Sequence, residues 1–260
     1  MHLFFAAQEG RTEAIKELLA GGAKVDLANN NGDTPLYVAA QNGHTEAIKA
    51  LLVGGAKVDL ANNNGDTPMF AAAQYVPTGV IKVLLAGGAK VDLALNDGTT
   101  PLYVAAQNGH RYAIKTLLGG GANMYKHKID GTTPLSIAAQ NGHTEAIKML
   151  LAAGAQVDMA ANDGTTPLYI AAQYGETDAI NALLAGRAKV DLAANDGATP
   201  LFVAAQKVDL ARNDGFTPLI VAAQNGRTEA IKALLAGGAR RPHRGHQGTG
   251  GRGCQGGSGQ

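Results

Sequence analysis

The stretch "GDTPLYVAAQNGHTEAIKALLVGGAKVDLANNN", from Gly32 to Asn64, decides the fold because nearly the same text returns along most of the chain. Its Thr-Pro pair recurs at one constant spacing, with proline at Pro35, Pro68, Pro101, Pro134, Pro167 and Pro200. Self-similarity at a fixed period of this length is typical of a solenoid, in which each unit packs only on its neighbours. The sequence therefore predicts a linear array of similar units.

Each unit carries its own signals for two short helices. Thr34 is suited to cap a helix N-terminus and Pro35 to occupy the first helical position, which predicts a helix that ends near Gln41. The Asn-Gly pair that follows breaks this helix. A second helix is predicted from about His44 to the glycine pair at 54–55. The remaining text is rich in Asn, Gly and Asp, which predicts an extended finger with a tight turn.

Helices this short are not stable alone, because an isolated helix becomes marginal in water only at about 12 to 15 residues. Stability must come from stacking the apolar face of each unit on the next. In the unit quoted above, this face comprises Leu36, Ala39, Ala40, Ile48, Leu51 and Leu52.

The composition of the 260 residues is that of a neutral protein, with 22 basic and 21 acidic residues and a formal net charge of +1. Such a balance offers no field that would attract nucleic acid or an anionic membrane. A single cysteine, Cys254, cannot form an internal disulfide, and the opening apolar run from Leu3 to Ala7 is too short for a signal peptide or a membrane span. We expect a monomeric cytoplasmic protein.

The segments T-P-L-Y-V-A-A, N-G-H, A-I-K-A-L-L and G-G-A-K-V-D-L-A at this period resemble the ankyrin repeat family over residues 1–239. The resemblance implies an all-α repeat solenoid of stacked helix-turn-helix units, each of about 33 residues, with short β-hairpin or finger loops. One departure runs throughout, because other residues replace the family's histidine after Thr-Pro-Leu, so packing must substitute for its hydrogen bonds. These residues are Tyr37, Phe70, Tyr103, Ser136, Tyr169, Phe202 and Ile220.

The array is predicted to be regular over residues 1–195, with a partial first unit and five full units, and irregular over 196–239. The Thr-Pro spacing is almost halved between Pro200 and Pro218, because the text passes directly from Gln206 to Lys207 and omits a second helix. Its three large apolar residues represent about 5 to 9 kcal/mol of burial. The last helix, near 228–235, is therefore expected to lack a direct predecessor and to bend inward or fray.

Two further units depart from the repeat. In "YVPTGV", residues 75–80, Val76 stands where the turn requires glycine, although Pro77 can still open a helix. In "NMYKHKID", residues 123–130, the finger loses its usual aspartate.

The Gly/Arg-rich tail, residues 240–260, is expected to be disordered. Codons for its residues, read one base later, permit the repeat text at nearly every position, so we interpret the tail as repeat DNA translated out of frame. The alternative is a basic arm that binds RNA.

No motif in the chain indicates a cofactor or an activated nucleophile. The string "GTGGRG", residues 248–253, has the dinucleotide-binding glycine pattern but neither the strand before it nor the helix after it. Cys254 has no partner base nearby. We therefore predict no cofactor.

Recurring histidines and carboxylates also have simple structural interpretations. His44, His110 and His143 occur once per unit and should be separated by the spacing of packed helices, which is several times the length of a bond to zinc. Carboxylates in the first turns of second helices favour the helix dipole rather than acid or base catalysis; these are Glu46, Glu145 and Asp178. We predict no metal site and no enzyme.

The resemblance implies a noncatalytic protein-protein interaction scaffold that binds its partner through finger tips and first-helix ends on the concave face. An RNA-associated protein that uses the basic tail is the alternative function, and a solvated face without a dedicated ligand is the alternative interpretation of the surface. The candidate partner-binding residues are Asn30, Asn31, Asp33, Gln41, Asn42, Asn63, Asn64, Asp66, Gln74, Tyr75, Asn96, Asp97, Thr99, Gln107 and Asn108.

Overall fold

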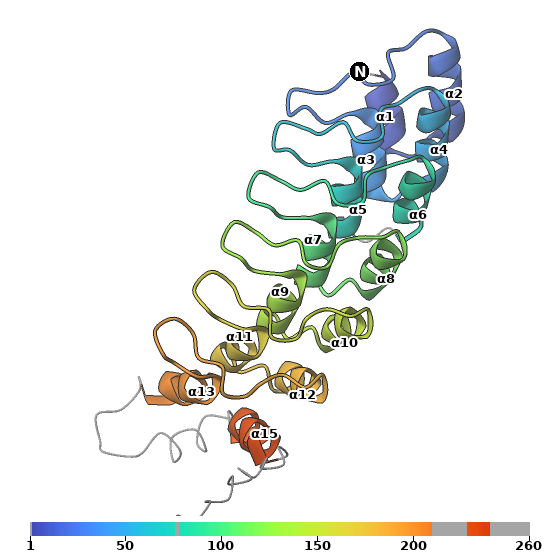
Figure 1. Cartoon of the computed structure of the whole chain (residues 1–260). Coiled ribbons are helices and arrows are strands. Elements are labelled where there is room, and N and C mark those ends of the chain that lie inside the picture. The colour runs from blue at the N-terminus through green and yellow to red at the C-terminus, as the bar shows by residue number, and fades with distance from the viewer. Residues whose placement is uncertain (1, 76–77, 210–227, 240–260) are drawn as a thin grey trace, which may run out of the picture.

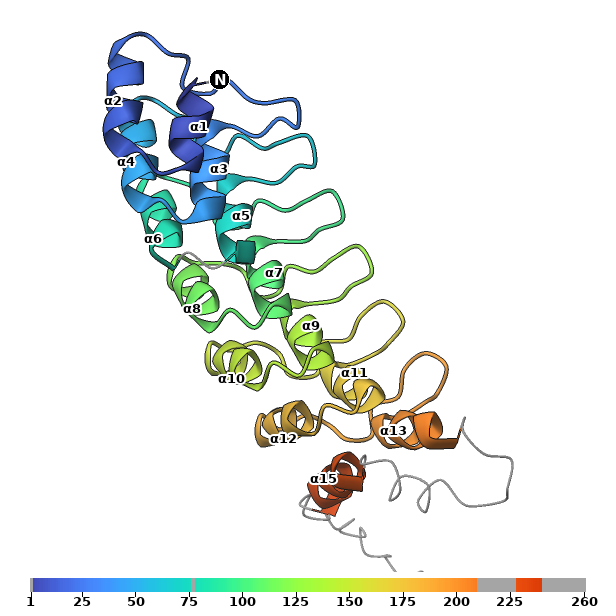
Figure 2. The same cartoon turned by 180° about the vertical axis from the view of Figure 1, so that it is seen from behind.

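The computed structural model of the chain describes residues 2–75, 78–209 and 228–239. Within these residues the chain forms fourteen helices and no strand, stacked in two rows (Figures 1 and 2). The inner row, next to the fingers, consists of α1 (His2–Gln8), α3 (Pro35–Asn42), α5 (Pro68–Tyr75), α7 (Pro101–Gln107), α9 (Pro134–Gln140), α11 (Pro167–Tyr174) and α13 (Pro200–Asp209). The outer row consists of α2 (Thr12–Ala20), α4 (Thr45–Val53), α6 (Thr78–Ala86), α8 (Arg111–Gly119), α10 (Thr144–Ala152), α12 (Thr177–Ala185) and α15 (Thr228–Ala239).

Each inner helix after α1 starts at the predicted Thr-Pro pair. The side-chain oxygen of Thr34 accepts a hydrogen bond from the backbone N–H of Tyr37 at 3.1 Å, and Pro35 occupies the first turn. This bond satisfies a donor that the helix itself cannot pair. The same bond forms at Thr67–Phe70, Thr100–Tyr103, Thr133–Ser136, Thr166–Tyr169 and Thr199–Phe202.

The turn between the two helices of a unit is bonded to the unit before it. His44 Nε2 lies 3.0 Å from the carbonyl oxygen of Gln8, and Asn42 Nδ2 donates to the same oxygen at 3.3 Å. Gly10, at a φ of +67°, leaves room for this ring, since a Cβ there would lie 2.6 Å from His44 Nδ1. The repeated Asn-Gly-His sequence therefore holds successive units together. Equivalent bonds join His110 and Asn108 to Gln74, and His143 and Asn141 to Gln107.

One continuous apolar core runs along the array between the two rows, from Leu3 to Leu234. Leu36, Ile48 and Leu51 are fully buried, as predicted. Consecutive inner helices contact one another from α1 to α13, and consecutive outer helices from α2 to α15. Inner-row alanines such as Ala39 have no exposed surface, which permits this close approach.

Side chains at the position of the family's histidine are mostly buried, as the predicted role in packing requires. Tyr37, Phe70, Tyr103 and Tyr169 retain 5–7% of their exposure. The exception is Phe202 on α13, which is 56% exposed. Ile220 lies outside the described residues.

Neighbouring fingers are joined by backbone hydrogen bonds to aspartates. Asp26 Oδ1 accepts a bond from the backbone N–H of Lys57 at 3.1 Å, and equivalent bonds recur further along the array. The finger at 123–130 has Tyr125 in place of this aspartate, and its hydroxyl instead donates to the carbonyl of Gly154 at 2.8 Å. The link to the next unit is therefore kept by a different group.

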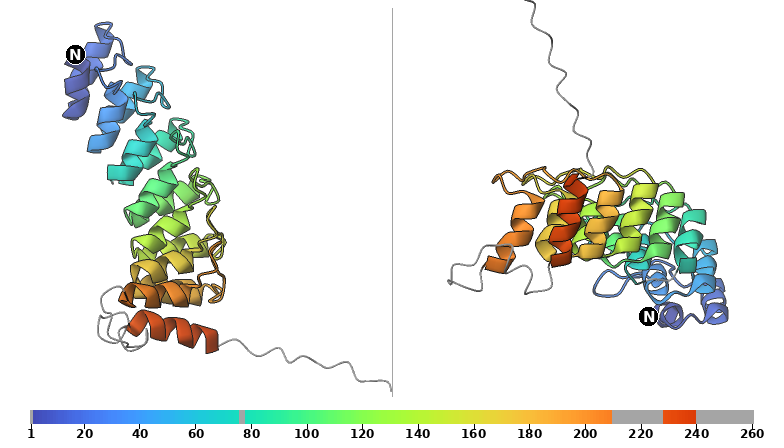
Figure 3. Two further views of the ribbon diagram at one scale, coloured as in Figure 1. Left: turned by 90° about the vertical axis from the view of Figure 1, so that its left-hand side faces the viewer. Right: turned by 90° about the horizontal axis from the view of Figure 1, so that it is seen from below.

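The last helix does not behave as the sequence suggested. Helix α13 continues through the Gln206–Lys207 junction to Asp209, and α15 contacts both α12 and α13 (Figure 3). The expectation that this helix lacks a direct predecessor is therefore wrong, because α15 packs on α12, the outer helix before it. It carries the same apolar register as the other outer helices, with Ile231 5% and Leu234 2% exposed, so it takes the outer place beside α12.

The packing of α15 is nevertheless less complete than that of the other outer helices. Leu235 is 48% exposed, and a hollow of about 390 Å³ lies between α15, α13 and the preceding finger. Val76, Pro77 and the tail at 240–260, with its glycine-rich string and Cys254, lie outside the described residues. The boundaries at 195 and 239 remain predictions.

The difference between a central and a terminal outer helix can be tested with matched leucines. Leu150 on α10 is fully buried between two neighbours. Leu150→Ala should therefore cost about 2–5 kcal/mol and lower the midpoint of the main urea transition measured by circular dichroism. Leu234→Ala should leave that midpoint nearly unchanged and increase hydrogen exchange within α15. Equal shifts for the two variants would show that α15 unfolds with the whole array.

Candidate functional site

The predicted partner-binding residues lie on three consecutive fingers and on the ends of α3, α5 and α7, along one side of the array (Figure 1). Most of them reach the surface, and Tyr75 is 51% exposed. Thr99 differs, because it is only 7% exposed and its backbone N–H donates to Asp97 at 2.9 Å. The prediction that Thr99 belongs to the binding surface is therefore wrong, because this residue is buried at the base of its finger.

Several of the asparagines hold the array together. Asn63 Nδ2 donates to the carbonyl of Asn30 at 3.0 Å, across two fingers. Asn42 and Asn108 donate to the inner helices of the units before them. These amides are therefore partly committed to stacking, and the surface left for a partner is smaller than the sequence suggested.

A hollow of about 410 Å³ lies between the first two fingers. Asp33 and Asp66 stand at its sides, and within the described residues neither has a lysine or arginine within ion-pair distance. Asn62 connects them, because its Nδ2 donates to Asp33 Oδ1 at 2.9 Å and lies 3.5 Å from Asp66 Oδ2. The full lining is Asn31, Asp33, Tyr37, Gln41, Asn62, Asn63, Asn64, Asp66 and Tyr75.

Tyr37 contributes a neutral phenol to this hollow. Burial, together with the charges of Asp66 and Asp33, raises the pKa of Tyr37 to about 12, while the hydrogen bond from Asn62 opposes the shift. The hydroxyl therefore stays protonated at neutral pH. The hollow combines two carboxylates, several amides and two tyrosines.

The third and fourth fingers show a different arrangement, in which the chain supplies its own cation. Lys128 Nζ lies 3.0 Å from Asp97 Oδ2 and 5.8 Å from the centroid of the Tyr103 ring. Burial alone would raise the pKa of Asp97, but hydrogen bonds from Thr99 and Lys128 outweigh it and lower the pKa to about 2. The residue that corresponds to Lys128 in the first hollow, two periods earlier, is Asn62, which brings no charge.

Sequence reasoning missed Tyr37, Asn62 and Lys128 as parts of this surface. The sequence pattern marks Tyr37 only as a replacement for the family's histidine. The sequence did contain a signal for Asn62 and Lys128. One finger position is occupied by Asn62, Leu95 and Lys128 in successive units, so the charge differs from finger to finger.

The described residues contain no group of three His, Cys, Asp or Glu side chains that could hold a metal ion. His44, His110 and His143 each bond to the unit before them. Glu46 and Glu145 form ion pairs with Lys49 and Lys148 on the outer helices.

Asp178 lies in the first turn of α12, as predicted. No helix in the described part of the chain is long and apolar enough to cross a membrane.

The raised pKa of Tyr37 predicts how stability depends on alkaline pH. The folded chain holds this proton more tightly than the unfolded chain, whose tyrosine has the ordinary value of 10.0, so stability is complete below pH 10 and falls as pH rises toward about 12. Urea unfolding across this range measures the effect, and Tyr37→Phe should reduce the slope. Part of the slope should remain, because burial also raises the pKa of Tyr103 and Tyr169. An unchanged slope in the variant would contradict the assignment.

Comparisons with known proteins agree with this architecture. The family described as "Ankyrin repeats (3 copies)" matches residues 3–94, 78–161 and 157–212, and the family described as "Ankyrin repeat" matches residues 214–244. The human ASB11 ankyrin repeat domain is 29% identical, with a TM-score of 0.75 over 91% of this chain and 97% of that chain.

The ankyrin repeat domain of Bcl-3, a unique member of the IkappaB protein family, is 26% identical, with a TM-score of 0.72 over 78% of this chain and 93% of that one. No curated protein matches the chain. With family matches over most of its length and the same stacked helical fold, the chain belongs to the ankyrin repeat family.

Proposed function

We propose that the chain is a noncatalytic scaffold that binds a protein partner through its concave, finger-bearing face. Ankyrin repeat domains are generally protein-protein interaction modules and are typically not catalytic. We further propose that the hollow between the first two fingers anchors a lysine or arginine side chain of the partner. The observation that carries this proposal is the pair of carboxylates, Asp33 and Asp66, without a cation of their own.

The preference for a cation follows from charge and geometry. Two carboxylates at the sides of one small hollow favour a positive group between them, and hydrogen bonds to charged groups are the stronger ones. The chain provides its own example in the third unit, where Lys128 pairs with Asp97 beside the ring of Tyr103. In the first hollow the carboxylates come from Asp33 and Asp66 and the ring from Tyr37, so a partner's lysine or arginine would meet the same kinds of group, although the carboxylates stand at a different finger position.

Tyr75 gives the hollow an aromatic edge. Its side chain is half exposed on the surface. Tyrosine is enriched among the residues that dominate binding energy at interfaces, because it buries a large rigid ring and keeps a polar hydroxyl. Gln41 and Asn64 add amides that can bond to a partner's backbone. The hollow can therefore recognise both the cation and the peptide that carries it.

We also propose that this scaffold is monomeric and cytoplasmic. The single cysteine, which cannot form an internal disulfide, fits a reducing compartment. The RNA-binding alternative depends on residues 240–260, which lie outside the described residues, and the family and structural matches give it no support.

Selection of peptides from a random phage-displayed library tests the anchor without knowledge of the partner. Peptides selected on the protein should share a lysine or arginine, and Asp33→Asn combined with Asp66→Asn should weaken their binding by about tenfold or more, because a charged hydrogen-bonding partner is lost. Fluorescence anisotropy measures the affinity.

Glu46→Gln is the matched control, since it removes an exposed carboxylate on the outer row, and it should leave binding unchanged. Circular dichroism verifies that all variants stay folded. Selected peptides without a shared basic residue, or equal binding by the Asp33→Asn/Asp66→Asn variant, would contradict the proposal.

A further inference from the structure

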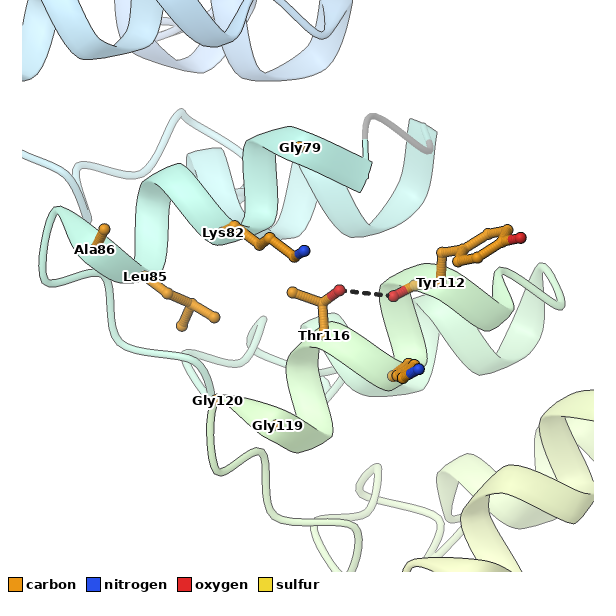
Figure 4. Close-up of a pocket in the computed structure, with 9 residues that line it drawn as sticks. Gly79, Lys82, Leu85, Ala86, Tyr112, Thr116, Gly119 and Gly120 are labelled. Carbon is orange, nitrogen blue, oxygen red and sulfur yellow. Dashed lines mark hydrogen bonds between the residues drawn. The ribbon is translucent and has the colours of Figure 1, made fainter.

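A second hollow, of about 900 Å³, lies between α6 and α8 (Figure 4). These two helices belong to the outer row, away from the fingers (Figure 1). Its walls are formed by Lys82, Leu85 and Ala86 of α6 and by Tyr112 and Lys115 of α8. In Figure 4 the ammonium of Lys82 extends into the space between the two helices, toward Thr116.

The two helices around this groove lack an acidic residue that the other lysine-bearing outer helices have. In those helices a lysine pairs with a glutamate one turn earlier, at 2.6–2.9 Å. In α6 the glutamate position holds Gly79, and in α8 it holds Tyr112. As a result, no carboxylate in the described part of the chain pairs with Lys82 or Lys115. The intact pairs are Glu13–Lys16, Glu46–Lys49, Glu145–Lys148 and Glu229–Lys232.

Among the outer helices in the described part of the chain, only α6 and α8 carry a net positive charge. Helices α6 and α8 contain Lys82, Arg111 and Lys115 and no acidic residue. Both helices that flank them, α4 and α10, carry a balanced glutamate–lysine pair. The positively charged region is therefore limited to the two helices that form this groove.

Two glycines leave space in the groove, and one of them, Gly79, stands where the other units have the glutamate. Gly79 has no side chain, and a Cβ at Gly119 would meet nothing within 4 Å. Leu85 lies against Gly120, where a Cβ would approach its Cδ1 to 2.7 Å, so an apolar side chain forms part of the groove wall. Tyr112 is 57% exposed, and its ring lies 5.1 Å from the guanidinium carbon of Arg111. The groove thus combines apolar surface with two unpaired ammonium groups.

We infer that this groove between α6 and α8 binds an acidic segment of a partner protein, in which carboxylates reach Lys82 and Lys115 and an apolar side chain lies against Leu85. Charge complementarity identifies the occupant. An extended polyanion such as RNA fits less well, because it would run past Glu46 on one side and Glu145 on the other. The site is separate from the finger face, so one array could hold two partners at once.

Titration with a fluorescein-labelled peptide of alternating glutamate and leucine pairs tests this inference by fluorescence anisotropy. The full chain should bind this peptide more tightly than the same peptide with glutamine for glutamate, and added salt should weaken the binding. Lys82→Ala combined with Lys115→Ala should lower the affinity by about tenfold or more. Lys49→Ala combined with Lys148→Ala is the matched control, because these lysines occupy the same helical position but are already paired. It should change the affinity by less than about twofold.

A second variant restores the repeat. Gly79→Glu with Tyr112→Glu gives both lysines the acidic neighbour that the other units have, and it should also abolish binding. A Cβ at Gly79 would lie 3.1 Å from Thr45 Cγ2, so circular dichroism must verify that this variant folds. If it does not fold, the Lys82→Ala/Lys115→Ala variant alone tests the inference. The inference is overturned if the acidic peptide does not bind, if the glutamine peptide binds equally, if both lysine pairs matter equally, or if an oligothymidylate binds more tightly through Lys82 and Lys115.

Discussion

Burial of each unit's apolar face against the next unit is the constraint on which the rest of the structure depends. The helices range from 7 residues in α1 to 12 residues in α15. At such lengths a helix gains little stability from its own hydrogen bonds. Hydrogen bonds between polar groups also join each unit to its neighbours. The histidine of three turns bonds to the preceding inner helix, and an aspartate or tyrosine of the first five fingers bonds to the following unit. Nearly every bond that crosses between units therefore joins residues about one period apart in the sequence.

A structure held by repeated contacts leaves its outward positions free to change. Where the chain keeps the repeat, charges are neutralised locally, as in the pairs Glu46–Lys49 and Glu145–Lys148. At two places in the described part of the chain, charge is left without an ion-pair partner. The first hollow has carboxylates without a lysine, and the groove between α6 and α8, where the repeat glutamate is replaced, has lysines without carboxylates. These two sites have opposite charge and lie on different rows of the array, so they would select chemically different partners.

The sequence predicted those features that depend on contacts within one period. Thr34 and Pro35 mark the start of α3, and the Asn-Gly turn marks its end, because capping and backbone conformation are local properties. The place of α15 could not be predicted in this way. Its packing on α12 passes over the interruption at residue 207, and a fixed period cannot describe a contact that skips part of a unit. The binding surface was predicted in outline only, because whether Asn63 bonds to the neighbouring finger, or Thr99 is buried, depends on how two units meet.

The groove on the outer row has a signal in the sequence, which is the replacement of glutamate by Gly79 and Tyr112. This signal indicates a binding site only once the structure places the two unpaired lysines on adjacent helices.

The central claim, that stability resides between units rather than within them, is tested most directly by shortening the array one unit at a time from its C-terminal end. Urea unfolding of each fragment, followed by circular dichroism, gives the free energy of unfolding as a function of the number of units. We expect this free energy to fall by a nearly constant amount for each regular unit removed, and a fragment of one unit, such as residues 34–66, to show no helical signal. A single unit that is helical and unfolds cooperatively, or a free energy that does not depend on the number of units, would contradict the account.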